Sequence, residues 1–219
     1  MLRQNFQKDL AELHTKLLSM GGRIEQMLRL ALEALRSGHP EPGEAVDNME
    51  IIIDAMAVEI DEFCIELIAK QQPVGQDLRR IIGAMRLAID MERVADISTN
   101  IVEQSRLLQR PLLKPLVDIP KMVDVASSML VDSLNALINS DVALANDVWH
   151  RDDVVDELCE RILVELRGMM SVDASLVPKA LPLLIVAIQV ERIADHATNI
   201  AESVAYIVEG KRIVYHKKH

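Results

Sequence analysis

Aromatic residues are scarce in this sequence, which has two Phe, two Tyr and one Trp among its 219 residues. Sandwiches and barrels rely on aromatic and β-branched side chains, whereas Leu, Ile, Val, Ala and Met suffice for packed helices. So few rings also leave no platform on which single-stranded bases stack. The composition therefore favours an all-α fold and argues against nucleic acid as a direct ligand.

Cysteines and long apolar runs are also few. Cys64 and Cys159 form neither a CxxC motif nor a disulfide framework, and we expect both to be small buried side chains. The longest apolar run, Ala180 to Ile188, contains Pro182 and is much shorter than the about 20 residues that cross a bilayer. The amino-terminal segment lacks the apolar stretch of a signal peptide. We therefore expect a cytoplasmic protein.

Positive charge is in deficit, since 24 Lys and Arg stand against 34 Asp and Glu, for a net charge of −10. Proteins that bind the phosphate backbone of nucleic acids usually carry the opposite excess. An acidic chain suits cations or basic protein partners, although −10 is also an ordinary charge for solubility.

Prolines divide the chain into long segments with helical periodicity. The segment 111–120, which holds three of the prolines, is the expected linker. We predict two tandem three-helix bundles, over 1–110 and 121–219, with no strand. The six predicted helices cover 4–37, 43–71, 75–108, 121–139, 141–170 and 176–209.

The two halves repeat one another. Residues 92–103 read ERVADISTNIVE and residues 191–202 read ERIADHATNIAE, which agree at eight of twelve positions. Chance would give about one match. An earlier acidic pair also recurs, because Glu50 and Asp54 align with Asp152 and Asp156. The architecture is therefore predicted to arise from internal duplication.

In each half, one helical stripe changes from apolar to acidic. Leu78, Ile82, Met85 and Ile89 are followed on that stripe by Glu92, Asp96, Asn100 and Glu103. The last helix repeats this order from Val177, Leu181, Leu184 and Ile188 to Glu191, Asp195, Asn199 and Glu202. We interpret the stripe as a packing seam that becomes acidic at the same place twice.

The turn near Pro73 places the earlier acidic pair beside this section. Helices joined there run antiparallel, so residues equidistant from the turn lie at the same height. Glu50 then faces Asp96, and Asp54 faces Glu92. The same count brings Asp152 and Asp156 to Asp195 and Glu191 in the second half. Each half is thus predicted to gather four carboxylates.

Four converging carboxylates repel one another unless positive charge, water or protonation relieves them. Arg93 and Arg192 are candidate charge partners, and a bound metal is the other solution. Oxygen ligands favour cations such as magnesium, manganese or iron. Asn100, Asn199 and His196 are candidate additional ligands. Geometry alone leaves open a metal site and a metal-free cluster bridged by arginine.

The duplicated ER-x-x-D-x-x-x-N-I segments, each preceded by an E/D-x-x-x-D segment, resemble the PhoU family of phosphate-uptake regulators. The segment AKQQPVGQDLRRI (69–81) resembles that family's turn between its second and third helices. Three positions depart from the usual pattern. Ala95 and Ala194 replace a common glycine, and Gln71 replaces a frequent arginine.

The resemblance implies a cytoplasmic regulator without catalytic activity. It would repress the phosphate-starvation response by acting between the ATPase subunit of the phosphate ABC transporter and a sensor histidine kinase, and would meet the membrane only through these partners. It also implies metal clusters, iron or zinc, on the acidic motifs, and a homodimer. By position the implied ligands are Glu50, Asp54, Glu92, Asp96, Asp152, Asp156, Glu191 and Asp195.

Two alternatives remain. One is a carboxylate-bridged di-metal protein or enzyme, although such sites usually include Glu-x-x-His pairs, which this sequence lacks. The other is a metal-free helical scaffold.

Overall fold

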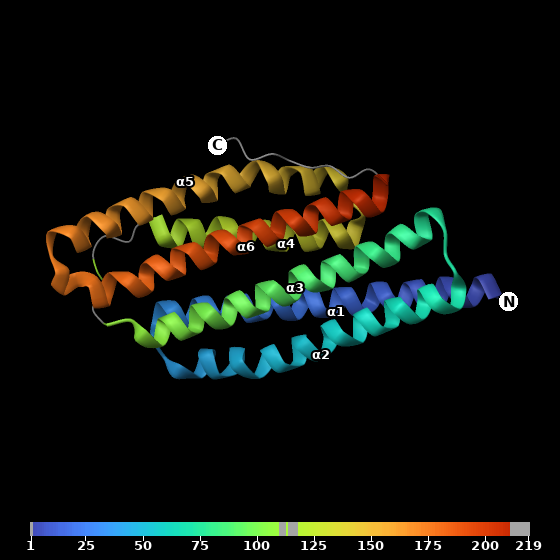
Figure 1. Ribbon diagram of the computed structural model, residues 1–219, viewed down its shortest axis with the longest axis horizontal. Coiled ribbons are helices and arrows are strands. Elements are labelled where there is room, and N and C mark those ends of the chain that lie inside the picture. Colours follow the sequence, from blue (N-terminus) through green and yellow to red (C-terminus); the bar gives the residue numbers. More distant parts are fainter. Residues whose placement is uncertain (1, 110–112, 114–117, 211–219) are drawn as a thin grey trace.

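The computed structural model describes residues 2–109, 113 and 118–210, and everything regular in these ranges is helical (Figure 1). The expected all-α fold is confirmed. Within these ranges six α-helices and one short 3-10 helix follow one another. They are α1 (Leu2–Ser37), α2 (Pro40–Gln71), α3 (Gly75–Leu107), α4 (Asp118–Asn139), α5 (Val142–Val172), η1 (Ala174–Leu176) and α6 (Val177–Glu209).

Local chemistry fixes the helix ends. Proline is tolerated in a first turn, where its missing N–H is not needed, so α2 begins at Pro40 and α4 runs through Pro120. For this reason α4 starts at Asp118, inside the predicted linker 111–120, most of whose other residues lie outside the described ranges. The Asp141 side chain accepts a hydrogen bond from the Leu144 amide and caps α5.

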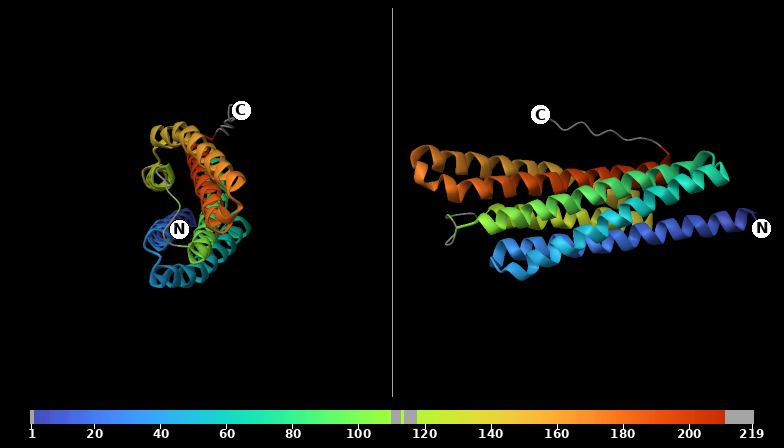
Figure 2. Two further views of the ribbon diagram at one scale, coloured as in Figure 1. Left: turned by 90° about the vertical axis from the view of Figure 1, so that its left-hand side faces the viewer. Right: turned by 60° about the horizontal axis from the view of Figure 1, so that its bottom comes forward.

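Four helices lie side by side in one layer, in the order α2, α3, α6, α5 (Figure 1). Helix α1 packs behind α2 and α3, and α4 packs behind α5 and α6 (Figure 2). The two predicted three-helix units are therefore joined along their third helices. Helices α3 and α6 run antiparallel at the centre, so the repeats are related by an approximate twofold axis through the layer.

The apolar stripe of α3 and α6 forms only part of the packing seam that its sequence suggested, since Met85 and Leu184 pack against the core but other members are exposed. The core of α3 lies on another face, which includes Ile81, Leu87 and Met91. By contrast, Ile89 is 57% exposed and Leu181 is 46% exposed. Both helices have apolar residues around most of their circumference, so periodicity alone could not identify the side covered by α1 or α4.

By length and composition, the stretch Ala174–Glu209 is the one helix of the described ranges that is long and apolar enough to cross a membrane. A core helix passes the same test. Here α6 packs against α3, α4 and α5 in the middle of the layer, and a third of its most apolar window is buried.

Small residues allow α3 and α6 to approach closely. Ala95 and Ala194 are fully buried, and a Cβ added at Gly83 would lie 2.4 Å from Cγ1 of Ile207. No side-chain carbon fits at that distance, so Ile207 or the helix must move.

We expect Gly83→Ala to destabilise the fold relative to the control Gly22→Ala. Both changes gain helix propensity, but only the first overpacks a contact, since nothing lies within 4 Å of a Cβ at Gly22. The overpacked variant should have an unfolding free energy about 1–3 kcal/mol below that of the control in urea denaturation. Equal unfolding free energies would show that the α3–α6 contact accommodates the added methyl group without destabilising the fold.

Candidate metal centre

Three of the predicted carboxylates of the first unit meet between α2 and α3. One oxygen from each of Asp54, Glu92 and Asp96 lies within 4.8 Å of the other two. Asp54 is exposed, whereas Glu92 and Asp96 are half-buried. The hairpin register thus places acidic side chains from two helices at one height, as the count from Pro73 predicted.

The fourth predicted carboxylate, Glu50, belongs to the same neighbourhood. Burial raises its pKa above the usual value, and the charges of Asp54 and Asp96 raise it further, while a hydrogen bond with Thr99 opposes the shift. The pKa of Glu92 is raised by burial first and by Asp96 second. Both upward pKa shifts result from partial burial of the carboxyl groups and from repulsion between neighbouring negative charges.

Arg93 neutralises part of this charge. Its Nη1 atom lies 2.9 Å from Oδ2 of Asp96, and its Nε atom lies 3.5 Å from Oε2 of Glu92. The Arg93 side chain is 53% exposed, so these ion pairs are screened by water. Its charge also lowers the pKa of Glu92, against the larger effect of burial.

The second unit repeats the acidic residues in a different setting. Asp152 is 6% exposed, and Asp156, Glu191 and Asp195 are half-buried. Burial, then Glu191 and Asp156, raise the pKa of the Cys159 thiol to about 11, so these carboxylates lie near one sulfur atom. The first unit has Ala57 at the equivalent position. Both cysteines are buried, as expected.

The other candidate residues of the second unit form hydrogen bonds with residues outside its four carboxylates. Arg192 donates from Nη1 to Oε1 of Gln189 at 3.5 Å. Nδ1 of His196 lies 3.0 Å from Oδ1 of Asp90, and Nδ2 of Asn199 donates to the same oxygen at 3.3 Å. These two candidate ligands therefore contact the first unit.

Sequence reasoning missed Asp90, Thr99 and Cys159. Asp90 lies on α3 two residues before Glu92, outside the acidic stripe, and its role appears only when α6 is packed alongside. Cys159 follows Asp156 by three residues and so shares its helical face, a signal that was available. Asn100 is half-buried on α3, one turn beyond Asp96.

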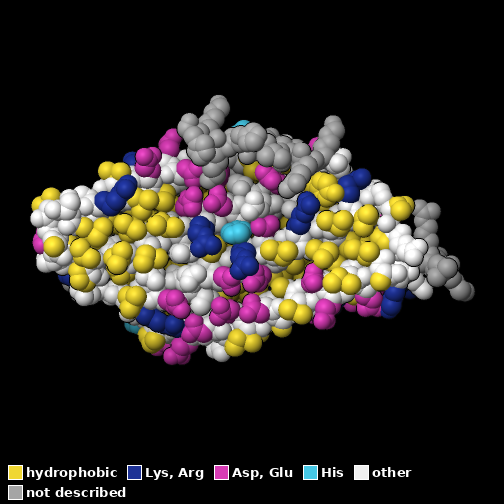
Figure 3. Space-filling model, viewed as in Figure 1, with side chains coloured by type: hydrophobic (Ala, Val, Ile, Leu, Met, Phe, Trp, Pro, Cys, Tyr) yellow, Lys and Arg dark blue, Asp and Glu magenta, His cyan; other side chains and the backbone are white. Residues whose placement is uncertain are grey.

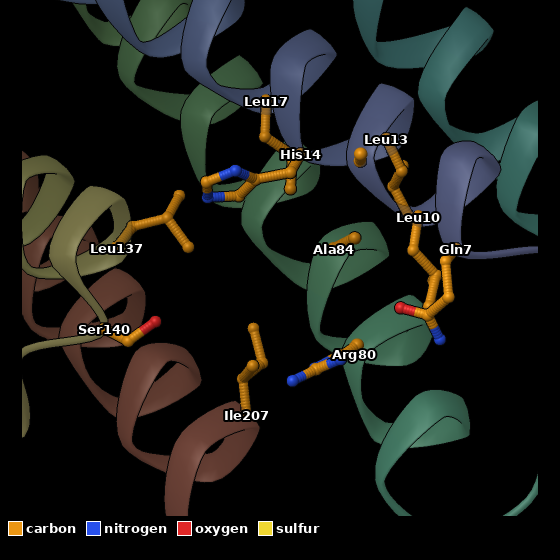
Figure 4. Close-up of a pocket in the computed structure, with 11 residues that line it drawn as sticks. Gln7, Leu10, Leu13, His14, Leu17, Arg80, Ala84, Leu137, Ser140 and Ile207 are labelled. Atoms are coloured by element: carbon orange, nitrogen blue, oxygen red, sulfur yellow. The ribbon is translucent and has the colours of Figure 1, made fainter. Parts of the chain in front are cut away.

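A separate pocket of about 310 Å³ lies between α1, α3, α4 and α6 (Figure 4). Leucines make up much of its lining, the His14 ring points toward Leu137, and the end of Arg80 lies beside Ile207. Arg80 precedes Glu92 by twelve residues, about 18 Å along the helix. The pocket is therefore distinct from the carboxylates and has none of their donor chemistry.

The carboxylates of the first unit fit a metal ion by their chemistry. Three oxygen donors from two helices, partly shielded from water, suit a hard or borderline divalent cation. Asp54, Glu92 and Asp96 would hold such an ion, with Glu50 close by. The ion pairs of Arg93 offer a second way to offset the same charge.

The duplicated helical units and their acidic motifs define a class of two-repeat helical proteins. The PhoU domain profile matches residues 17–105 and 119–204, one domain in each unit. The chain belongs to the PhoU family.

Full-length relatives support this assignment. The chain is 37% identical to a protein of Clostridium acetobutylicum named phosphate-specific transport system accessory protein PhoU homolog, over 97% of this chain and 98% of that one. It is 30% identical to the Escherichia coli protein of that system, named PhoU, over 94% of this chain and 86% of that one.

Solved structures agree with the fold. The crystal structure of PhoU from Pseudomonas aeruginosa superposes with a TM-score of 0.90 at 30% identity, over 94% of this chain and all of that one. The regulatory protein PhoU from Streptococcus pneumoniae gives 0.89 at 27% identity, over 96% of this chain and all of that one.

We expect Arg93→Ala to destabilise the metal-free protein more than Arg192→Ala. The first change removes ion pairs with Glu92 and Asp96 and leaves their mutual repulsion, whereas the contact of Arg192 is with a neutral amide. The difference should be about 0.2–1 kcal/mol in chelator-treated samples, the range for exposed ion pairs, and should shrink in high salt. Equal losses would mean that Arg93 does not relieve the cluster.

Proposed function

We propose that the protein is a negative regulator of phosphate uptake and of the phosphate-starvation response. What supports this most strongly is the full-length similarity to relatives named as accessory proteins of the phosphate-specific transport system. In this role it acts as an adaptor between the ATPase subunit of the phosphate ABC transporter and a sensor histidine kinase. It acts from the cytoplasm, as a homodimer, and catalyses no reaction.

The acidic character of the protein supports an adaptor role. Two groups of carboxylates lie on helices next to the α3–α6 contact, and the chain as a whole carries a charge of −10. Such a surface attracts basic segments of partner proteins and accelerates their encounter. Phosphate status reaches the protein through these partners, because the sequence has no phosphate-binding loop.

We further propose that the carboxylate groups bind metal ions, with iron or zinc favoured over manganese or magnesium. In the first unit the ligands are Glu50, Asp54, Glu92 and Asp96, and in the second they are Asp152, Asp156, Glu191 and Asp195. A bound cation supplies the positive charge that relieves their repulsion and links two helices. The close approach of Asp54, Glu92 and Asp96 supports this proposal.

Deletion of the gene should leave phosphate-responsive genes active at high phosphate. A reporter driven by a promoter of the starvation response measures this, and restoring the gene on a plasmid should return the reporter to its repressed level. Reporter expression that stays low in the deletion strain would refute the regulatory role, whatever the protein binds.

Elemental analysis of untagged protein purified without chelator should find about two or more iron, zinc or manganese ions per chain. A variant with Glu92, Asp96, Glu191 and Asp195 changed to Ala should lose them. Circular dichroism of the variant verifies its helical content. Equal metal content in the two proteins would place the metal elsewhere, and metal absent from both would favour the arginine-bridged cluster.

A further inference from the structure

Two apolar patches lie on the face of the layer that α1 and α4 leave uncovered (Figure 3). The α3 patch comprises Ile82, Met85 and Ile89. The α6 patch comprises Leu181, Leu184 and Ile188. Of these, Ile89 is 57% exposed and Ile188 is 37% exposed. Figure 3 shows hydrophobic side chains toward both ends of this face and charged ones in its middle. Ile82, Met85 and Leu184 are half-buried, and the last two also pack against the core. Apolar side chains exposed together on one face mark an interaction site.

The face is hollowed beside the α3 patch. A depression of about 250 Å³ is lined by Ile89 and Arg86 of α3 and by Glu202 and Tyr206 of α6, among others. Cζ of Arg86 lies 5.3 Å from the centre of the Tyr206 ring, which holds the rim in place. Most of the lining is polar, because Asp90, Asn199, Glu202 and Ser203 lie around Ile89, so the recess suits a polar side chain of a partner next to the α3 patch.

The distance between the patches follows from the antiparallel register. Asp90 meets His196 and Gly83 meets Ile207, so Ala95 and Ala194 lie at one height. Ile89 and Ile188 each precede their alanine by six residues, on opposite sides of it. At 1.5 Å per residue they are about 18 Å apart along the layer.

Between the patches lies a charged waist with an acidic excess. By the same register, nine carboxylates, two guanidiniums and one imidazole lie at heights between Ile89 and Ile188. They are Glu50, Asp54, Asp90, Glu92, Asp96, Asp152, Asp156, Glu191, Asp195, Arg93, Arg192 and His196, and of these Asp152 is only 6% exposed. The nine carboxylates outnumber the two guanidiniums by seven, so the waist keeps a negative charge at neutral pH even with two divalent ions bound.

The charge pattern selects among occupants of this face. A second copy placed face to face would bring one acidic waist against another, and an anionic membrane surface would be repelled in the same way. A protein segment with basic residues between two apolar ends satisfies both the patches and the waist.

We propose that this face docks a helical segment of a partner protein with apolar side chains about twelve residues apart and Lys or Arg between them. The apolar ends occupy the α3 and α6 patches, and the basic centre lies over the waist. The proposal rests on the adaptor function and specifies which surface performs it and what chemistry it recognises.

The test uses a fluorescently labelled helical peptide with leucines about twelve residues apart on one face and lysines between them. One comparison peptide carries glutamates in place of the lysines, and another carries serines in place of the leucines. The protein should bind the first peptide at least about tenfold more tightly than either comparison, both as purified and after treatment with chelator. The variant Ile89→Ser with Ile188→Ser should lose at least about tenfold in affinity. The control Ile138→Ser, on α4 and 48% exposed, should bind as the original protein does.

Several results would overturn the proposal. Equal binding of the lysine and glutamate peptides would show that the charge of the waist does not contribute to docking. Unchanged binding by the double variant would show that the α3 and α6 patches do not contribute. If ultracentrifugation shows that the original protein is a dimer and the double variant a monomer, the face binds a second copy of the chain. Loss of binding to vesicles of anionic phospholipid in the double variant would assign it to a membrane. The adaptor function is tested separately by the reporter, so a failed peptide test with a derepressed deletion strain rejects this face alone.

Discussion

The antiparallel contact between α3 and α6 is the constraint on which the rest of the molecule depends. It joins two three-helix units that each have their own acidic hairpin, and the missing side chain of Gly83 on α3 leaves room for Ile207 of α6. Because α1 and α4 both pack on one side of this pair, the opposite side of the layer stays open (Figure 2). Carboxylates that would otherwise belong to separate bundles are thereby placed on either side of one shared contact.

The duplicated acidic motifs have acquired different surroundings. In the first unit the guanidinium of Arg93 forms ion pairs with the carboxylates, whereas in the second unit the buried thiol of Cys159 lies beside them. An ionised carboxylate stabilises a nearby cation and disfavours a nearby thiolate, so the same motif has different electrostatic consequences in the two places. Sequence identity between the repeats is thus a poor guide to equivalence of the two sites.

Much of the fold could be predicted from the sequence because it depends on local features. Proline positions and helical periodicity located all six helices, and the count from Pro73 brought Asp54 to the height of Glu92. What could not be predicted depends on the packing of one unit against the other. The exposure of Ile89 and the contact between Asp90 and His196 require knowing which faces of α3 and α6 are covered. No periodicity within one helix contains that information.

The twofold relation between the repeats also explains how an unsymmetrical contact arises in a nearly symmetrical molecule. In an assembly of two identical chains, every substitution occurs twice and every contact across the axis is mirrored. Here both halves belong to one chain, so Asp90 has Gln189 as its counterpart and His196 has Ile97. The pair of Asp90 and His196 is consequently present on one side of the axis alone. Covalent joining of the halves has allowed the molecule two distinguishable sides, and a partner bound across the axis therefore has one preferred direction.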